Sequence, residues 1–328
     1  MKIEDFEIFK FGENEYSTFN NNKTYLLNKH PYLDIVLTDH CNSNCNFCIA
    51  DLIHNKLNCD INIFKEKILY AIEKMNVNEV LLLGGEPTVS KHLIPLIKWL
   101  SDINLLDKIV MTTNGIRLAN DEKYRKELFE SGLTHINISY MSQFKDQQQK
   151  INNTNHYISL GDIRRIYLDA KKYNVNLRIN NNIFKSNNDN LKDLLTFYNN
   201  IKDSCDSIKF SPILEVDDFS VVNKKIKWAK ENRLDDEHIL NLFNSIHEYF
   251  SNAHNISIIE NDLQFGFVKN SLIPLKTPII LNWNFGDFTG MMKKVKEENK
   301  INNIKLLPNN ELSLSWNREL EEYFIKTN

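Results

Sequence analysis

The sequence predicts an α/β fold built on a parallel sheet, and three observations lead to this prediction. Short apolar runs rich in branched residues alternate with segments whose apolar residues recur at helical spacing. The alternation repeats without interruption between residues 32 and 215. Strand–helix units in this order pair their strands in parallel through right-handed crossovers. Periodicity alone leaves open both a doubly wound sheet and a (β/α) barrel.

Each expected element follows from its local pattern. We expect strands at residues 32–38, 79–83, 108–112, 135–140, 176–183 and 207–214. We expect helices at residues 61–75, 92–100, 121–130, 160–173 and 190–201. Residues 1–31 are expected to be an irregular polar segment, and residues 32–215 the core. After residue 215 the alternation ends, and a helix at 235–250 precedes short strand-like runs and a hairpin turn at Pro308. Residues 216–328 are therefore predicted to form an α+β extension that caps the core.

Composition excludes several classes of protein. The chain has 328 residues, of which 42% are hydrophobic and 25% charged, with a formal net charge of −3. This balance argues against a mainly electrostatic nucleic-acid binder. No apolar window is long enough to span a membrane, and the acidic first residues do not read as a signal peptide. Five cysteines do not form a secreted disulfide framework, so a reducing cytoplasm is the predicted location.

Three of the cysteines lie in one short segment directly after the first expected strand. Cys41, Cys45 and Cys48 have the spacing C-x3-C-x2-C, and three thiolates in one loop can converge on a soft metal centre. A structural zinc ion needs four protein ligands, and His40 or His54 could supply the fourth. A non-catalytic zinc protein therefore remains the alternative from a different class. An iron–sulfur cluster with three protein ligands would instead leave one iron open to an exogenous ligand.

The second expected strand ends in Gly84-Gly85-Glu86-Pro87. Adjacent glycines let the backbone approach a ligand closely because no Cβ intervenes. A carboxylate beside them can pair with an ammonium group. The alternative is an ordinary tight turn with a solvated glutamate. The position of this segment, one strand after the cysteines, favours a shared site.

The two motifs together resemble the signature of the radical S-adenosylmethionine (radical SAM) superfamily. The first motif is C-x3-C-x-Phe-C, and the resemblance implies that Cys41, Cys45 and Cys48 hold one [4Fe–4S] cluster whose open iron binds SAM. It implies a partial (β/α)6 TIM-like barrel followed by the α+β extension. It also implies that Phe47 packs near the SAM adenine. No catalytic residue beyond the cluster ligands is assigned.

The resemblance extends to further SAM contacts. The cofactor-binding residues that it implies are Phe47, Gly84, Gly85, Glu86, Ser139, Arg178 and Asn180. Glu86 is expected to hold the methionyl amino group, and Ser139 and Arg178 to contact the ribose and carboxylate. Asn180 resembles an asparagine of the branch that includes the molybdenum-cofactor cyclase. The alternative for Ser139 and Arg178 is a polar side chain that simply faces solvent.

Departures from the pattern narrow the expected function. The sequence is closest in pattern to the cyclase and peptide-modifying branch, but no cysteine follows Cys205, so a second cluster is not expected. Leu81 stands where the cyclase has an arginine that meets the nucleotide, and the chain ends without Gly-Gly, so that cyclase is rejected. Cys59 and Cys205 are interpreted as buried structural thiols. Trp283 and Trp316 are expected to pack the extension or to line a substrate cavity.

The resemblance implies an oxygen-sensitive enzyme that cleaves SAM reductively to a 5′-deoxyadenosyl radical, which abstracts hydrogen from substrate. An external one-electron donor, flavodoxin- or ferredoxin-like, is the expected partner. The missing nucleotide residues favour a peptide or protein substrate, although the short N-terminal segment leaves no room for a leader-recognition domain. A nucleotide-like or other small molecule is the alternative substrate.

Overall fold

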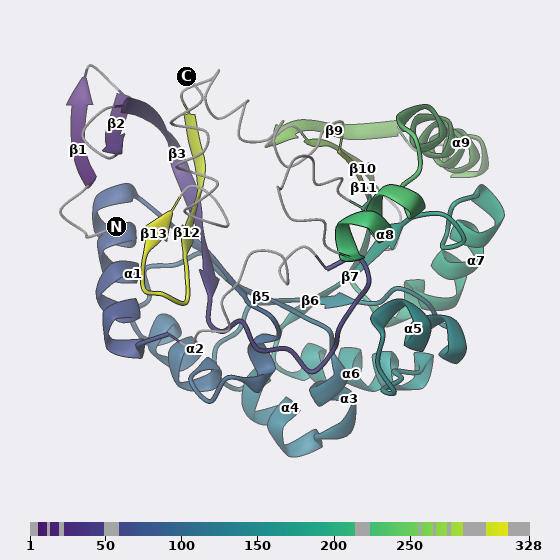
Figure 1. Ribbon diagram of the computed structural model, residues 1–328, viewed down its shortest axis with the longest axis horizontal. Coiled ribbons are helices and arrows are strands. Elements are labelled where there is room, and N and C mark those ends of the chain that lie inside the picture. The colour runs from purple at the N-terminus through teal and green to yellow at the C-terminus, as the bar shows by residue number, and fades with distance from the viewer. Residues whose placement is uncertain are drawn as a thin grey trace.

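The computed structural model describes residues 6–11, 14–19, 23–48, 59–213, 224–254, 257–264, 267–273, 277–284 and 300–313. Its described strands belong to one curved sheet, and Figure 1 shows the first seven helices in an arc around the outside of that sheet. The strands that correspond to the expected core are β3 (Lys23–Val36), β4 (Glu79–Leu83), β5 (Lys108–Thr113), β6 (His135–Ser139), β7 (Asn176–Ile183) and β8 (Ser207–Pro212).

Two strands of the C-terminal extension lengthen this parallel sheet, one at each edge. β12 (Lys300–Leu306) runs parallel to β3, and β11 (Ile279–Asn284) runs parallel to β8. The pairings between β3 and β8 are all parallel as well. Within the described residues no pairing joins β11 to β12, so the sheet curves without closing. The predicted α/β fold with a parallel sheet is confirmed.

Local signals in the sequence explain where the outer helices begin. These helices are α1 (Ile61–Met75), α2 (Leu93–Asp102), α3 (Ile116–Asn120), α4 (Glu122–Phe129), α5 (Lys145–Asn152), α6 (Leu160–Lys172) and α7 (Leu191–Ile201). The Asp60, Asp121 and Asn190 side chains each accept a hydrogen bond from the first turn of the helix that follows them. Ser159 and Asp162 form a reciprocal capping box at α6. α3 and α5 were not expected from the sequence.

The two faces of the sheet have different chemistry. On β7, Leu177 and Ile179 are fully buried and pack with the helices in the main hydrophobic core. Arg178 and Asn180 alternate with them and are only half-buried. Since successive side chains of a strand point to opposite faces, Arg178 and Asn180 lie on the inner, concave face. The interior of the curved sheet is therefore partly polar.

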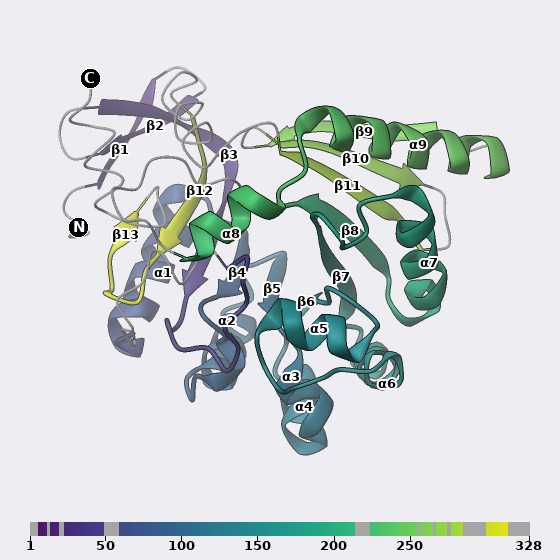
Figure 2. The same cartoon turned by 45° about the vertical axis from the view of Figure 1, so that its right-hand side comes forward.

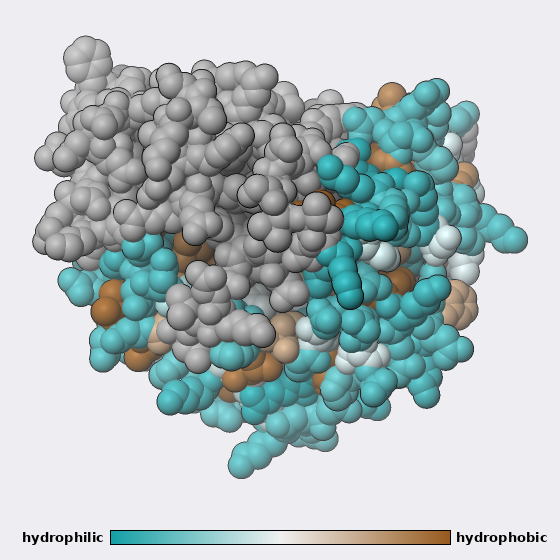
Figure 3. Space-filling model, viewed as in Figure 1, coloured by the Kyte–Doolittle hydropathy of each residue, from teal (hydrophilic) through white to brown (hydrophobic). Residues whose placement is uncertain are grey.

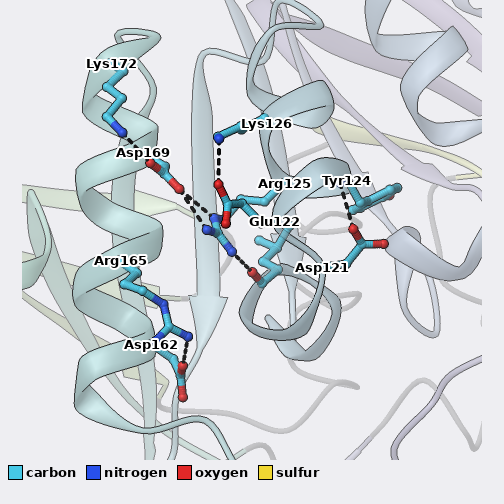
Figure 4. A network of polar contacts seen from close by, with 10 residues as sticks. Asp121, Glu122, Tyr124, Arg125, Lys126, Asp162, Arg165, Asp169 and Lys172 are labelled. Atoms are coloured by element: carbon cyan, nitrogen blue, oxygen red, sulfur yellow. Dashed lines mark hydrogen bonds and ion pairs between the residues drawn. The ribbon is translucent and has the colours of Figure 1, made fainter.

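A buried ion pair joins two of the outer helices (Figure 4). Arg125 on α4 donates from Nε to Asp169 on α6 at 2.9 Å, and its Nη1 donates to the carbonyl of Leu118 at 2.5 Å. Lys172 donates to the second Asp169 oxygen at 2.7 Å. Each polar group is matched by a partner, as a buried charge requires. This network holds α4 against α6 and lies on the helical side of the sheet, away from the inner face.

The N-terminal segment differs from the expectation. β1 (Phe6–Phe11) and β2 (Asn14–Phe19) form an antiparallel meander with the first half of β3, so the prediction of an irregular segment is wrong. These runs are rich in aromatic residues and threonine, which favour strands. Pro31 lies inside β3 and cannot donate to a ladder, and the register of β12 against β3 shifts in that stretch.

The extension also contains α8 (Lys224–Asn232), α9 (Asp236–His254), β9 (Ser257–Gln264), β10 (Phe267–Ile273) and β13 (Leu312–Ser313). β9 and β10 continue the sheet antiparallel from β11, and β13 pairs with β12. Figure 2 shows α8 between β12 and β8. The division into domains stays a prediction. Trp316 and the side chain of Trp283 lie outside the described residues.

The described surface is mainly hydrophilic, with scattered hydrophobic side chains on the face seen in Figure 3. Among the helices that the structure describes, none has both the length and the apolar composition needed to cross a bilayer.

Candidate active site

The three clustered cysteines lie on the loop that leaves the carboxyl end of β3. Cys41 is exposed, whereas Cys45 and Cys48 are half-buried, and the Cys48 N–H donates to the Cys45 carbonyl at 3.2 Å. Burial raises the pKa of Cys41 to about 11 and that of Cys45 to about 12, and Cys48 adds to both shifts through its charge. Lys225 on α8 opposes both shifts. The three sulfurs therefore lie within electrostatic reach of one another.

The donor set of this loop fits an iron–sulfur cluster. Thiolates are the ligands that such clusters take, and each cysteine binds a separate iron atom. A single zinc ion instead requires its ligands to converge within about 2.3 Å of one point. His40 is exposed, and His54 lies outside the described residues.

The Gly84-Gly85 pair brings the cysteine loop against the end of β4. Gly85 donates to the Thr38 carbonyl at 2.7 Å, and the Glu86 N–H donates to the His40 carbonyl at 2.8 Å. A Cβ at either glycine would overlap the carbonyl oxygens of Thr38 or His40. The close approach that the sequence predicted is thus made, in the described residues, by the backbone of the cysteine loop. Contact of these glycines with SAM stays a prediction.

Glu86 is the polar hub of this edge. Its side chain is buried, and Oε1 accepts from the Thr88 N–H at 3.1 Å, the Thr88 hydroxyl at 2.7 Å and the Thr113 hydroxyl at 2.5 Å. Oε2 accepts from the Asn114 N–H at 2.7 Å. Burial raises the pKa of Glu86, and these donors oppose the shift. The carboxylate therefore fastens the end of β4 to the end of β5. Its expected role toward the methionyl amino group stays a prediction.

The three remaining polar residues lie on the inner face of neighbouring strands. Ser139 at the end of β6 is in register with Asn180 on β7. Arg178 Nε donates to Asn180 Oδ1 at 3.0 Å, and burial lowers the pKa of Arg178 to about 10. In the described part of the chain, no carboxylate forms an ion pair with Arg178. A partly desolvated guanidinium in this position suits an anionic ligand group.

Phe47 begins an aromatic chain that sequence reasoning missed. Its ring lies 6.3 Å from that of Phe184, which follows β7, and Phe184 meets the Trp228 ring of α8 edge-on at 5.2 Å. Phe184 belongs to a small hydrophobic cluster with Met141 and Ala229, separate from the main core. These three aromatic rings link the cysteine loop to the extension. Packing of Phe47 near adenine stays a prediction.

The end of α5 also holds the cysteine loop in place. Sequence reasoning missed this contact as well. Asn44 N–H donates to the Asn152 carbonyl at 3.2 Å, and Asn46 N–H donates to the Ile151 carbonyl at 3.1 Å. The Cys45 thiol donates to Asn152 Oδ1 over 3.7 Å. Asn152 and Asn153 at the end of a polar segment were the available signal, because asparagine is common at helix ends.

A buried carboxylate lies deeper on the inner face. Asp34 on β3 is in register with Lys305 on β12, and its Oδ2 accepts from Asn303 at 2.9 Å. Its Oδ1 has no hydrogen-bond partner among the described residues. Burial raises the pKa of Asp34 to about 6, and Lys305 opposes the shift. No local sequence pattern distinguishes Asp34 from any other residue of an apolar strand.

A curved, unclosed parallel sheet with three cysteines at the carboxyl end of its first parallel strand defines a class, that of partial-barrel enzymes with an iron–sulfur cluster. Comparison with known families agrees. The model of the radical SAM superfamily matches residues 35–199, and the chain belongs to this superfamily.

Similar proteins support the assignment at different lengths. A GTP 3',8-cyclase of Aquifex aeolicus is 30% identical over 194 residues, which are 57% of this chain and 58% of the relative. The chain thus spans less than two thirds of that relative, and half of a GTP 3',8-cyclase of Clostridium perfringens that is 33% identical over 175 residues. A GTP 3',8-cyclase of Clostridium botulinum is 27% identical over 92% of this chain and 95% of its own length.

Solved structures show the fold. SuiB of Streptococcus suis, crystallised with S-adenosylmethionine, has a TM-score of 0.60 at 14% identity and covers 89% of this chain and 61% of its own. Methylornithine synthase (PylB) has a TM-score of 0.51 at 11% identity over 86% and 74%. The predicted partial TIM-like barrel, the radical SAM enzyme class, and the cofactors [4Fe–4S] and SAM are confirmed.

Proposed function

We propose that Cys41, Cys45 and Cys48 hold the single [4Fe–4S] cluster of this enzyme. We also propose that the enzyme abstracts hydrogen from a peptide or protein substrate. When bound, the cluster supplies the electron that splits SAM into methionine and a 5′-deoxyadenosyl radical, which takes the hydrogen atom. The protein binds, orients and shields the reactants. The hydrogen bonds that join the cysteine loop to the end of β4 and to the end of α5 support this assignment of the ligands.

Residues around the loop have distinct tasks in this proposal. Arg178, Ser139 and Asn180 bind the carboxylate and ribose of SAM from the inner face. Phe47 excludes water on the adenine side, backed by Phe184. The exposed residue Cys41 marks the side from which a flavodoxin- or ferredoxin-like electron donor approaches.

The single observation that carries the substrate class is the buried Asp34 carboxylate. Its Oδ1 lacks a hydrogen-bond partner among the described residues, and its strand neighbour in register on β4 is the apolar Leu81. A buried acceptor without a partner is costly, and a peptide N–H or an ammonium group would satisfy it. A triphosphate here would meet the Asp34 carboxylate, and the neighbouring cation Lys305 already donates to Asn303 at 2.7 Å. This position therefore favours a substrate that donates hydrogen bonds.

A second candidate is a nucleotide-like substrate. It is favoured by the name of the relatives, GTP 3',8-cyclase, one of which aligns with 92% of this chain. Arg178 could serve an anionic group of such a substrate as well as it serves SAM.

The two candidates separate in one anaerobic assay of 5′-deoxyadenosine formation. The reconstituted enzyme receives SAM, a reductant and either GTP or an unfractionated cell extract, which contains proteins, peptides and small molecules. The extract is used intact, after protease digestion and after phosphatase treatment. We expect the intact extract to stimulate formation of 5′-deoxyadenosine. Protease digestion of the extract should abolish this stimulation, and phosphatase treatment should leave it unchanged. Stimulation by GTP, or loss of stimulation only after phosphatase, would replace the peptide proposal by the nucleotide one.

A further inference from the structure

The last turn of α5 forms a cradle for the middle of the cysteine loop. Two loop amides, of Asn44 and Asn46, donate to the carbonyls of Asn152 and Ile151, and the Asn46 side chain donates to the Lys150 carbonyl at 3.1 Å. Backbone contacts on both sides of Cys45 fix its register against the helix end. As a result the Asn152 amide lies beside the Cys45 sulfur, at 3.7 Å.

The polarity of that contact must reverse when the sulfur binds iron. In the described state the Cys45 thiol donates to Asn152 Oδ1. A cysteine bound to iron is a thiolate and has no proton to donate. The oxygen and nitrogen of an asparagine amide exchange places by rotation about its last torsion angle. Rotation turns Nδ2–H toward the sulfur at the same position of the side chain.

The surroundings of Cys45 make this donor important. α5 ends here, and the carboxyl end of a helix carries partial negative charge that disfavours an anion. Cys45 is also half-buried, so water reaches it less than it reaches the exposed Cys41. Cys41 has its own donor, the Ser43 N–H at 3.4 Å. For Cys45, the described side chain in hydrogen-bond range is Asn152.

We infer that Asn152 donates a hydrogen bond to the Cys45 sulfur in the cluster-bound enzyme and thereby raises the reduction potential of the cluster. A donor stabilises the more negatively charged, reduced state, and hydrogen bonds to the sulfurs are among the factors that set the potentials of such clusters. Asn152 is thus a positioning residue that acts through Cys45. The inference rests on the proposed role of Cys45 as a ligand.

The test is a redox titration of the reconstituted full chain without SAM, followed by the electron paramagnetic resonance signal of the reduced cluster. Asn152→Leu removes the donor, and Asn152→Asp replaces it by a negative charge of the same shape. We expect a lower ratio of reduced to oxidised cluster at a fixed potential in both. In Asn152→Asp this ratio should fall about tenfold, which corresponds to a midpoint potential lower by about 59 mV for a one-electron couple. The matched control is Asn155→Asp, an exposed position three residues on, with a change below about twofold.

Each outcome decides the inference. Normal iron content with a lowered midpoint in both Asn152 variants and an unchanged midpoint in the control supports it. An unchanged midpoint in Asn152→Asp overturns it. Loss of iron from both Asn152→Leu and Asn152→Asp also overturns it, because Asn152 would then hold the loop rather than tune a bound cluster. If Cys45→Ala retains a full cluster, the proposed ligand assignment fails instead, and that result is read separately.

Discussion

Two polar regions of the barrel satisfy their buried groups in opposite ways. At the rim, which comprises the cysteine loop, Glu86 and Asn114, both Glu86 oxygens accept hydrogen bonds from neighbouring residues. At the seam between β3 and β12, which comprises Asp34, Asn303 and Lys305, one Asp34 oxygen is bonded to Asn303 and the other has no partner among the described residues. Both carboxylates are buried.

The difference separates a carboxylate that fixes the local fold from one that is able to recognise a ligand. A buried carboxylate whose two oxygens both accept hydrogen bonds fixes the geometry of the segments around it. A buried carboxylate with a free acceptor site keeps an energetic demand that a ligand can meet. The rim thus holds the cysteines in place, and the seam remains able to select a substrate.

The largest expected effect is on the rim. Cys41→Ala, Cys45→Ala and Cys48→Ala should each abolish retention of the cluster and cleavage of SAM, because three ligands leave none to spare. The fold should persist, since the loop is fastened by backbone contacts rather than by sulfur. Iron content and the melting temperature of the apoprotein measure both effects. Cys205→Ala, at the buried amino end of β8, is the control and should keep its iron.

Glu86→Gln should have the next largest effect. The substituted amide presents an N–H to donors that now bond to the carboxylate, which leaves a buried donor unpaired. We expect the free energy of unfolding to fall by about 1–3 kcal/mol. Urea unfolding of the apoprotein measures it, with Thr113→Val, which removes one donor to Glu86, as the smaller matched change.

SAM binding sharpens the comparison for the same variant. Iron content should stay nearly intact while SAM affinity falls roughly ten- to hundredfold, if Glu86 also contacts the amino group. Equilibrium binding to the reconstituted variant measures the affinity. Reduced stability with unchanged SAM affinity would make Glu86 a purely architectural residue, and the predicted contact would be dropped.

At the seam, Asp34→Asn should change how stability depends on pH. The folded pKa of Asp34 is about 6, above the ordinary 3.8, so the folded state binds more protons between these values. Wild-type stability from this group is therefore present at low pH and lost as pH rises through about 4 to 6. Relative to wild type, the variant should gain about 2–3 kcal/mol between pH 4 and pH 7. Urea unfolding at both pH values measures this, and a difference independent of pH would refute the assignment.

The smallest expected effect concerns the link between the rim and the extension. Trp228→Phe keeps an aromatic side chain against Phe184, but a smaller one. We therefore expect the free energy of unfolding to fall by less than about 1.5 kcal/mol. SAM affinity should weaken only slightly. Trp99→Phe on the outer helix α2 is the matched control. If the binding free energy of SAM falls by more than the free energy of unfolding in Trp228→Phe, α8 positions Phe47 through Phe184.

Local signals in the sequence predicted much of the fold. α1, β4 and β7 have the predicted bounds, because their patterns are clean and turn residues or caps end them. The cysteine and Gly-Gly-Glu motifs were visible for the same reason, since each is contained in a few residues. The contacts of Asp34 with Asn303 and of Cys45 with Asn152 join residues 269 and 107 positions apart. Periodicity carries no information about such pairs, so the seam and the α5 cradle emerged only from the structure.

The parallel pairing of β3 with β12 sets an order of events during synthesis. Asn303 leaves the ribosome 269 residues after Asp34, a delay of about 15–50 s at ordinary translation rates. Until then one side of β3 offers unpaired amides and carbonyls, which invite pairing with strands of other chains. A charge directed from such an edge is one way in which proteins discourage that pairing. We therefore expect Asp34 to discourage aggregation at this edge of the nascent chain until β12 covers it.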